Sequence, residues 1–266
     1  MLRNVFLKTL RDHRRSLIGW TIGLTAFTVF VLAFYPTVHE SGDQFNELLR
    51  TLPPALRAIS GRVADLSPEG YLNGQYFNLL APLLLLIFAI GFGARTLAGE
   101  EREGTLELVL ATPVPRWRLV TEKFAALAVG TAMIGVVMVI VLAVGTPPFG
   151  IDVAVGRLVQ AVLSAVLLAL VFGSLALAAG AITGKPSVGT TVALVLAVNS
   201  YLINAFASLN DTVDAIKGLS PFYYYNAADP VRNGADPLHL LFLAFLTFMF
   251  FSVALITFDR RDVGTG

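Results

Sequence analysis

Cysteine is absent from this chain of 266 residues, and histidine is scarce. Without cysteine the chain has no disulfide framework, no thiolate nucleophile and no cysteine-bound metal. The three histidines, His13, His39 and His239, are far apart in the sequence, and none lies deep in an apolar run. We therefore expect them at surfaces or interfaces, and we predict no metal-binding, cofactor-binding or catalytic residues in this chain.

Charged residues are also few. They make up 14% of the chain, whereas hydrophobic residues make up 56%. A soluble domain does not have this composition, but an integral membrane protein does. The net charge of +1 argues against a nucleic-acid partner, which would require a concentrated basic face.

Long apolar runs are what the sequence has in abundance. Six of them are each near the roughly 20 residues that an α-helix needs to cross a bilayer. We predict an all-α integral membrane protein with one transmembrane domain over residues 1–266, with the lipid bilayer as its surroundings. The predicted spans are about 17–35, 77–94, 124–144, 158–181, 188–207 and 238–258.

A basic amphipathic helix is predicted ahead of the first span, over residues 1–15. Its apolar residues recur at helical spacing between five basic residues, which is typical of a helix lying in the membrane interface. The apolar residues are Leu2, Val5, Phe6 and Leu10, and the basic ones are Arg3, Lys8, Arg11, Arg14 and Arg15.

The basic residues also predict the orientation in the membrane. With six spans, both termini lie on one side, and that side carries 13 Lys and Arg residues against 6 on the other. The positive-inside rule therefore puts both termini and the segment 100–123 in the cytoplasm.

No Asp, Glu, Lys, Arg or His lies in the middle of any span. Ion-coupled carriers and intramembrane proteases usually need such groups, so both are disfavoured. The most polar cluster is in the fifth span, where Asn199, Tyr201 and Asn204 are candidates for lining a cavity. Hydrogen bonding between helices is the alternative that we favour for the two asparagines.

Small residues recur at helical spacing in two spans. Gly19 and Gly23 in the first span would let a neighbouring helix approach closely, either a second copy of the chain or another span of the same copy. In the fourth span Ala176, Gly180 and Gly184 form a second close-packing face. The Gly184–Lys185 pair falls short of a phosphate-binding loop because Pro186 stands where a hydroxyl is needed, so we expect no ATP hydrolysis by this chain.

The most charged segment, residues 95–124, lies between the second and third spans. We expect Gly104 to end the preceding helix and Thr105 to cap a short new one. Thr112 would then cap the next helix, with Pro113 at its first position. The short helix would present Leu106, Val109 and Leu110 as an apolar patch with a charged rim, which is a candidate surface for a partner.

This segment resembles the cytoplasmic coupling segment of ABC-2 type transporter permeases. The dense match covers about a tenth of the chain, and the layout of the spans covers the rest. The matching residues are Glu101, Glu103, Gly104, Thr105, Leu106, Glu107, Val109, Leu110, Thr112, Pro113, Val114 and Arg116. The alternative is a solvated loop whose leucines rest on the membrane surface of the chain itself.

The resemblance implies the permease subunit of an ABC exporter in a prokaryotic plasma membrane. Such a permease works with a second permease copy and a separate ATP-binding subunit, which binds the ATP and magnesium. It also implies short re-entrant helices in the loop 208–237, where the sequence alone slightly favours an ordinary interfacial loop. A different class of function stays open: a mechanical transmitter that relays ATPase cycles to an external partner without moving cargo.

Overall fold

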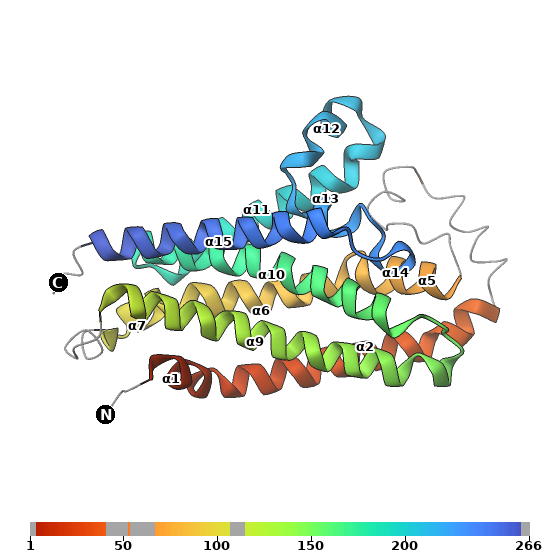
Figure 1. Ribbon diagram of the computed structural model, residues 1–266, viewed down its shortest axis with the longest axis horizontal. Helices are drawn as coiled ribbons and strands as arrows, with labels where there is room; N and C mark the ends of the chain where they lie inside the picture. Colours follow the sequence, from red (N-terminus) through yellow and green to blue (C-terminus); the bar gives the residue numbers. More distant parts are fainter. Residues whose placement is uncertain (1–3, 41–52, 54–66, 107–114, 262–266) are drawn as a thin grey trace.

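The protein is described by a computed structural model over residues 4–40, 53, 67–106 and 115–261, and all regular secondary structure in these ranges is helical. Six long helices lie side by side as a bundle (Figure 1). Five of them, and the helical stretch Pro68–Thr96 that contains the sixth, are long and apolar enough to cross a membrane, which confirms the predicted fold class. They are α2 (Arg14–Glu40), α6 (Leu80–Thr96), α9 (Arg116–Gly145), α10 (Val155–Thr183), α11 (Pro186–Phe206) and α15 (Pro237–Arg260).

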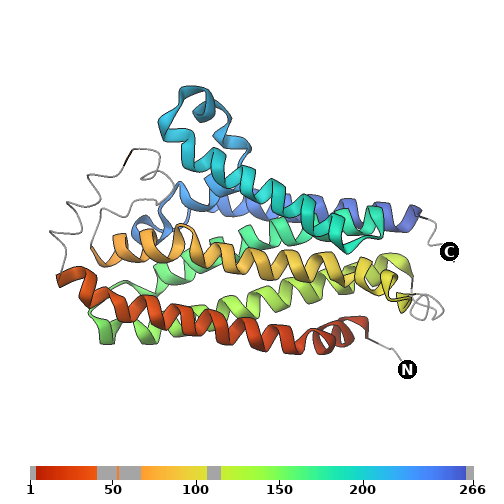
Figure 2. The same ribbon diagram turned by 180° about the vertical axis from the view of Figure 1, so that it is seen from behind.

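Shorter helices connect them. At the end that holds both termini lie α1 (Val5–Asp12) and α7 (Ala98–Arg102), as Figures 1 and 2 show. At the opposite end lie α5 (Pro68–Tyr71), α12 (Asp211–Ile216), α13 (Pro221–Asn226) and α14 (Pro230–Asn233). Single turns of 3₁₀-helix occupy Pro147–Phe149, Ala207–Leu209 and Lys217–Leu219. The shared end of the termini agrees with an even number of crossings.

Two of the long helices extend beyond the predicted spans. α2 continues past Tyr35, the end of the first predicted span, through Pro36 to Glu40. The ring of Tyr35 packs against His39 and Tyr71, with ring centroids 5.4 and 5.0 Å apart, and these contacts support the helix beyond the proline. α9 likewise begins at Arg116, ahead of the predicted third span, and the polar side chains of its first turns find partners inside the protein.

The second span is interrupted near the end of the bundle opposite the termini. A π-helix (Leu72–Phe77) follows α5, and the helical conformation is interrupted at Leu79 before α6 begins. The hydroxyl of Tyr225 in α13 donates a hydrogen bond to the carbonyl oxygen of Phe77 at 2.5 Å. The helices between α11 and α15 therefore support the interrupted span.

The loop 208–237 contains short helices. It folds into α12, α13 and α14, of which α13 and α14 pack against α10, whereas α12 projects from the bundle (Figure 1). Phe222 and Val231 are buried there.

The core is organised around α10, the most completely buried of the six long helices. It packs against α6, α9, α11 and α15. A Cβ atom on Gly93 of α6 would collide with the carbonyl oxygen of Gly173, and one on Gly189 of α11 would lie 2.6 Å from the carbonyl oxygen of Ala176. The predicted close packing on this face of α10 is confirmed at Ala176.

The other two small residues of the predicted face, Gly180 and Gly184, differ in their roles. A Cβ atom on Gly180 would lie 3.4 Å from the Cβ of Ala98, which is ordinary contact. Gly184 does not pack as a helix residue but caps α10, with a φ of 69° that side-chain-bearing residues rarely adopt.

Candidate functional site

The segment that precedes the third span leaves the bundle through α7. Gly104 has a φ of 70° and ends the helical region there, as predicted. The hydroxyl of Thr105 donates to the carbonyl oxygen of Glu100 at 3.2 Å and so ties the turn back to α7. The predicted site residues Glu107, Val109, Leu110, Thr112 and Pro113 lie outside the described residues.

Leu106 departs from the expectation. Its side chain is 1% exposed and lies in an apolar cluster of this chain that includes Val5, Leu97, Leu119 and Phe258. The prediction that this leucine is buried only against a partner is therefore wrong. The alternative, that it rests on its own chain, holds for Leu106, which anchors the start of the segment to α1, α9 and α15.

The helix that follows the segment, α9, begins later than predicted. Pro115 has an extended backbone, with a ψ of 144°, and α9 begins at Arg116 rather than at Pro113. One guanidinium nitrogen of Arg116, Nη1, donates to carbonyl oxygens at the end of α15. The acceptors are Phe258 at 3.5 Å, Asp259 at 3.4 Å and Arg261 at 2.5 Å. A cation at the C-terminal end of a helix is stabilised by the exposed carbonyls.

Glu101 is engaged within the chain as well. Its carboxylate accepts two hydrogen bonds from the guanidinium of Arg261, which also donates to the carbonyl oxygen of Ala181 at 3.1 Å. Arg261 was not predicted as a site residue, because nothing in the sequence links it to a position 160 residues earlier. Glu103 and Gly104 are the exposed residues among the described part of the motif, so a partner can reach them.

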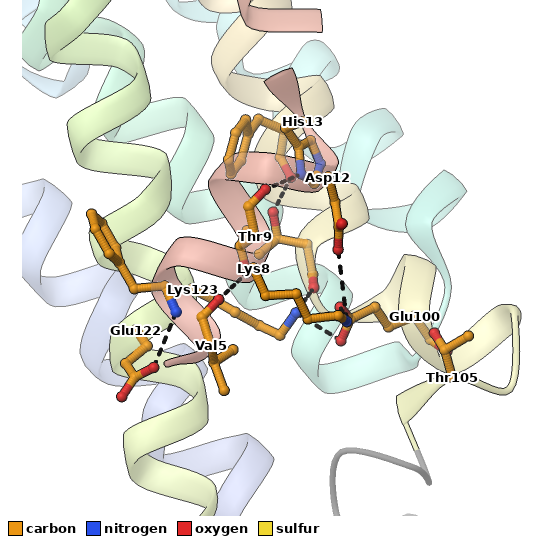
Figure 3. Close-up of polar contacts among 12 residues, drawn as sticks. Val5, Lys8, Thr9, Asp12, His13, Glu100, Thr105, Glu122 and Lys123 are labelled. Carbon is orange, nitrogen blue, oxygen red and sulfur yellow. Dashed lines mark hydrogen bonds and ion pairs between the residues drawn. The ribbon is translucent and has the colours of Figure 1, made fainter. Parts of the chain in front are cut away.

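A buried lysine joins the two helices that flank the segment. Lys123 of α9 is 1% exposed, and its Nζ donates to the carbonyl oxygen of Thr96 at 2.6 Å. The same atom lies 2.8 Å from Oε2 of Glu100 (Figure 3). The position of Lys123 at a helix start suggests either a salt bridge or a snorkelling side chain, and the structure shows the salt bridge.

Glu100 has a second cation partner. Its Oε1 accepts a hydrogen bond from Nζ of Lys8 in α1 at 2.8 Å, and Asp12 lies 3.7 Å from the same nitrogen. We call Lys8, Glu100, Lys123 and the carbonyl of Thr96 the inner clasp, because together they join α1, α6, α7 and α9.

The charges of the inner clasp alter the pKa values of its members. Burial raises the pKa of Glu100, but the ammonium groups of Lys123 and Lys8 outweigh it and hold that pKa below its ordinary value. Burial lowers the pKa of Lys8, but the carboxylates of Glu100 and Asp12 outweigh it and keep that pKa above its ordinary value. Both groups are therefore charged at neutral pH.

Glu122, next to Lys123, fixes the start of α1. Its carboxylate accepts from the backbone N–H of Phe6 at 3.0 Å and from Nε of Arg118 at 2.7 Å. A carboxylate is favoured at the N-terminus of a helix, where backbone N–H groups are free. The N-terminal helix α1 is thus held against α9. Val5, on its predicted apolar face, is buried in the bundle.

His13 is half-buried at the junction of α1 and α2. Its ring stacks on Phe92 with centroids 4.1 Å apart, and its Nδ1 lies 3.0 Å from the carbonyl oxygen of Thr9. Burial lowers the pKa of His13 below 6.5 against the opposing hydrogen bond to Thr9, and the nearby ammonium of Lys123 adds to the lowering.

The predicted packing glycines face away from the bundle. Outside their own helix, no heavy atom of the described residues lies within 4 Å of a Cβ built on Gly19 or Gly23. Within the part of the chain that the structure covers, the alternative of packing against another span of the same copy is therefore wrong.

The three polar residues of the fifth span do not converge. Asn199 is exposed and donates to the carbonyl oxygen of Val195 in its own helix at 2.7 Å, so hydrogen bonding to another span is wrong for it in this copy. Tyr201 packs against Phe222 with ring centroids 5.5 Å apart, and Asn204 is half-buried.

Comparison with known proteins agrees with the resemblance of the coupling segment. The family model described as ABC-2 family transporter protein matches residues 3–263, nearly the whole chain. No curated protein matches the chain. Members of this family are membrane permeases of ABC transporters and are typically non-catalytic. The chain, a multi-pass membrane protein, belongs to the ABC-2 transporter family.

Proposed function

We propose that the protein is the permease subunit of an ABC exporter, driven by a separate ATP-hydrolysing subunit that binds the segment between α7 and α9. One observation carries the proposal. Both ends of this segment are fastened to the bundle, at Leu106 and Glu101 on one side and at Arg116 on the other. A partner that moves the segment would therefore move the helices attached to it.

The contact with the ATPase is assigned to the motif residues that do not serve as anchors. Glu103 and Gly104 are exposed, and Glu107, Val109, Leu110, Thr112 and Pro113 follow within the motif. ATP would close the ATPase subunits, the segment would move with them, and the attached spans would tilt. ATP and magnesium would be bound by the partner and not by this chain.

The end of the bundle that holds both termini is assigned to the cytoplasm. The excess of Lys and Arg at this end supports the assignment, and so does the need for a cytosolic ATPase to reach the segment. The resemblance supports a prokaryotic plasma membrane as the location of the permease.

A second permease copy would complete the transport pathway. The outward position of Gly19 and Gly23 supports a close helix contact with that copy, homologous or identical, because no described part of this copy covers them. Asn199 also points outward from α11, and in a dimer it would line either the contact or the pathway. Spans without central charges suit amphiphilic cargo better than small hydrated ions.

One structural feature favours the second candidate, a transmitter that moves no cargo. At the end opposite the termini, α12 projects from the bundle (Figure 1), while α13 is joined to the second span by the bond from Tyr225 to Phe77. Motion of the second span could reach an external partner by this route.

Reconstitution separates the two candidates. The permease and its ATPase would be co-purified, placed in proteoliposomes and screened with amphiphilic compounds for stimulated ATP hydrolysis and uptake. An exporter predicts at least one compound that does both. Hydrolysis that responds only to an external protein partner would favour the transmitter.

A further inference from the structure

The proposed function assigns no role to one buried charge, the ammonium of Lys123. Lys123 is among the largest fully buried side chains of the bundle. A buried ammonium is costly unless it is paired and hydrogen-bonded, and replacing such a group by an apolar residue of similar size is often neutral or stabilising. Packing alone therefore does not require a lysine at this position.

The partners of Lys123 show what the charge does. All of them come from the helices on the other side of the segment: the carbonyl oxygen of Thr96, the last residue of α6, at 2.6 Å, and Glu100 of α7 at 2.8 Å. Lys123 itself lies in the first turns of α9. The ammonium therefore bridges the helix that enters the segment and the helix that leaves it (Figure 3).

Glu100 extends the bridge to a third element. It accepts from Lys8, so the carboxylate holds α1 and α9 through two cations. Asp12 lies 3.7 Å from Lys8 and balances the second positive charge. The clasp is thus electrically balanced, and it needs Lys123 to reach α9.

We propose that Lys123 is a positioning residue that locks the inner ends of α6 and α9 together, so that the segment between them moves both spans as one body. The proposal rests on the proposed function for its purpose, but the lock itself is a property of this chain alone. Without Lys123 the segment would still bind its partner, whereas the two spans would no longer follow it together.

The lock is tested first without any ATPase. Because the chain lacks cysteine, Arg95→Cys on α6 and Trp117→Cys on α9 give two exposed spin-label positions near the inner end. The interspin distance distribution is measured in the purified permease with Lys123, with Lys123→Met and with Lys185→Met. Lys185 is the matched control, since none of the described residues pairs with its ammonium.

We expect a narrow distribution for the native chain and for Lys185→Met, and a distribution several-fold broader for Lys123→Met at unchanged helix content. An unchanged width in Lys123→Met would overturn the lock. Loss of helix content in Lys123→Met would also overturn it, because the lysine would then be needed for folding. Glu100→Gln, which keeps an acceptor for Lys123, should broaden the distribution less.

The second arm tests the purpose of the lock in the complex with the ATPase. Recovery of the ATPase on the permease should be unchanged by Lys123→Met, whereas the ATP-dependent change in thiol reactivity of Val144→Cys, at the far end of α9, should fall several-fold. An undiminished change would overturn the proposed role. If no ATPase binds even the native chain, the proposed function fails, while the spin-label result still decides the lock.

Discussion

The guanidinium of Arg261 binds the carboxylate of Glu101 through both of its terminal nitrogens, which joins the end of the chain to the segment after α6. Arg261 in turn presents its carbonyl oxygen to Arg116 at 2.5 Å. The first glutamate of the coupling motif and its last arginine therefore meet through a residue outside the motif.

This pair predicts a measurable coupling between Glu101 and Arg261. Both side chains are partly exposed, so the interaction should contribute up to about 1 kcal/mol to the free energy of unfolding. A double-mutant cycle with Glu101→Gln and Arg261→Met, followed by denaturant unfolding in detergent, measures it. Strictly additive effects would show that the pair contributes nothing.

Removing the anion of the inner clasp, Glu100, should reduce stability more than removing its buried cation, Lys123. Glu100→Ala leaves Lys123 buried without its anion, which should cost about 3–5 kcal/mol of stability, whereas Lys123→Met should cost far less. Adding Lys123→Met to Glu100→Ala should restore most of the loss. Thermal unfolding of the three variants checks this order, and a double variant as unstable as Glu100→Ala would contradict it.

His13 predicts an acid-sensitive step above the titration of the carboxylates. Its pKa is lowered below 6.5 in the folded protein, so the folded state binds the proton less readily than the unfolded state. Its stabilising contribution is present above pH 6.5 and is lost as the pH falls through the folded pKa.

The melting temperature of the native chain should therefore decline as the pH is lowered below 6.5. His13→Phe, which can still stack on Phe92, should remove this step. The decline due to Glu100 should persist in the variant and begin only below 4.5, since the pKa of that carboxyl is also lowered. An identical pH profile for both proteins would contradict the assignment to His13.

The outward glycines predict a dimer contact that can be broken without harm to the fold. A Cβ at Gly19 or Gly23 meets no described atom outside its own helix, so we expect each copy of Gly19→Leu with Gly23→Leu to insert and fold normally. Crosslinking in detergent should then give several-fold less dimer. Gly156→Leu, at another glycine with open space around it, is the matched control. Undiminished dimer in the folded double variant would show that these glycines lie against lipid.

The sequence was sufficient for the architecture because each span is a local signal, about 20 apolar residues long. It was less informative about helix ends, which depend on tertiary partners. The polar start of α9, expected from Pro113 and observed from Arg116, is held by partners of Glu122 and Lys123 in α1, α6 and α7. Tyr35 and His39 likewise carry α2 beyond Pro36.

The position of the site along the chain was predicted, but its three-dimensional contacts were not. The motif located the segment, yet it could not show that Leu106, Glu101 and Arg116 bind their own chain. Some of these contacts join positions more than 100 residues apart, such as Glu101 with Arg261 and Arg116 with Arg261. Spacing within a motif carries no information about such pairs.

The most direct test of the central claim is recovery of the ATPase on permease variants of the segment. Val109→Asp with Leu110→Asp places charges on the proposed contact, where burying each apolar side chain would contribute roughly 1.5–3 kcal/mol. Leu106→Asp is unsuitable because it would disrupt the core of the permease itself. Leu219→Asp, an exposed leucine near the opposite end, is the matched control. We expect the double variant to reach the membrane at normal levels but to retain almost no ATPase, with full recovery on the control. Full ATPase recovery and normal activity of the double variant would contradict the account.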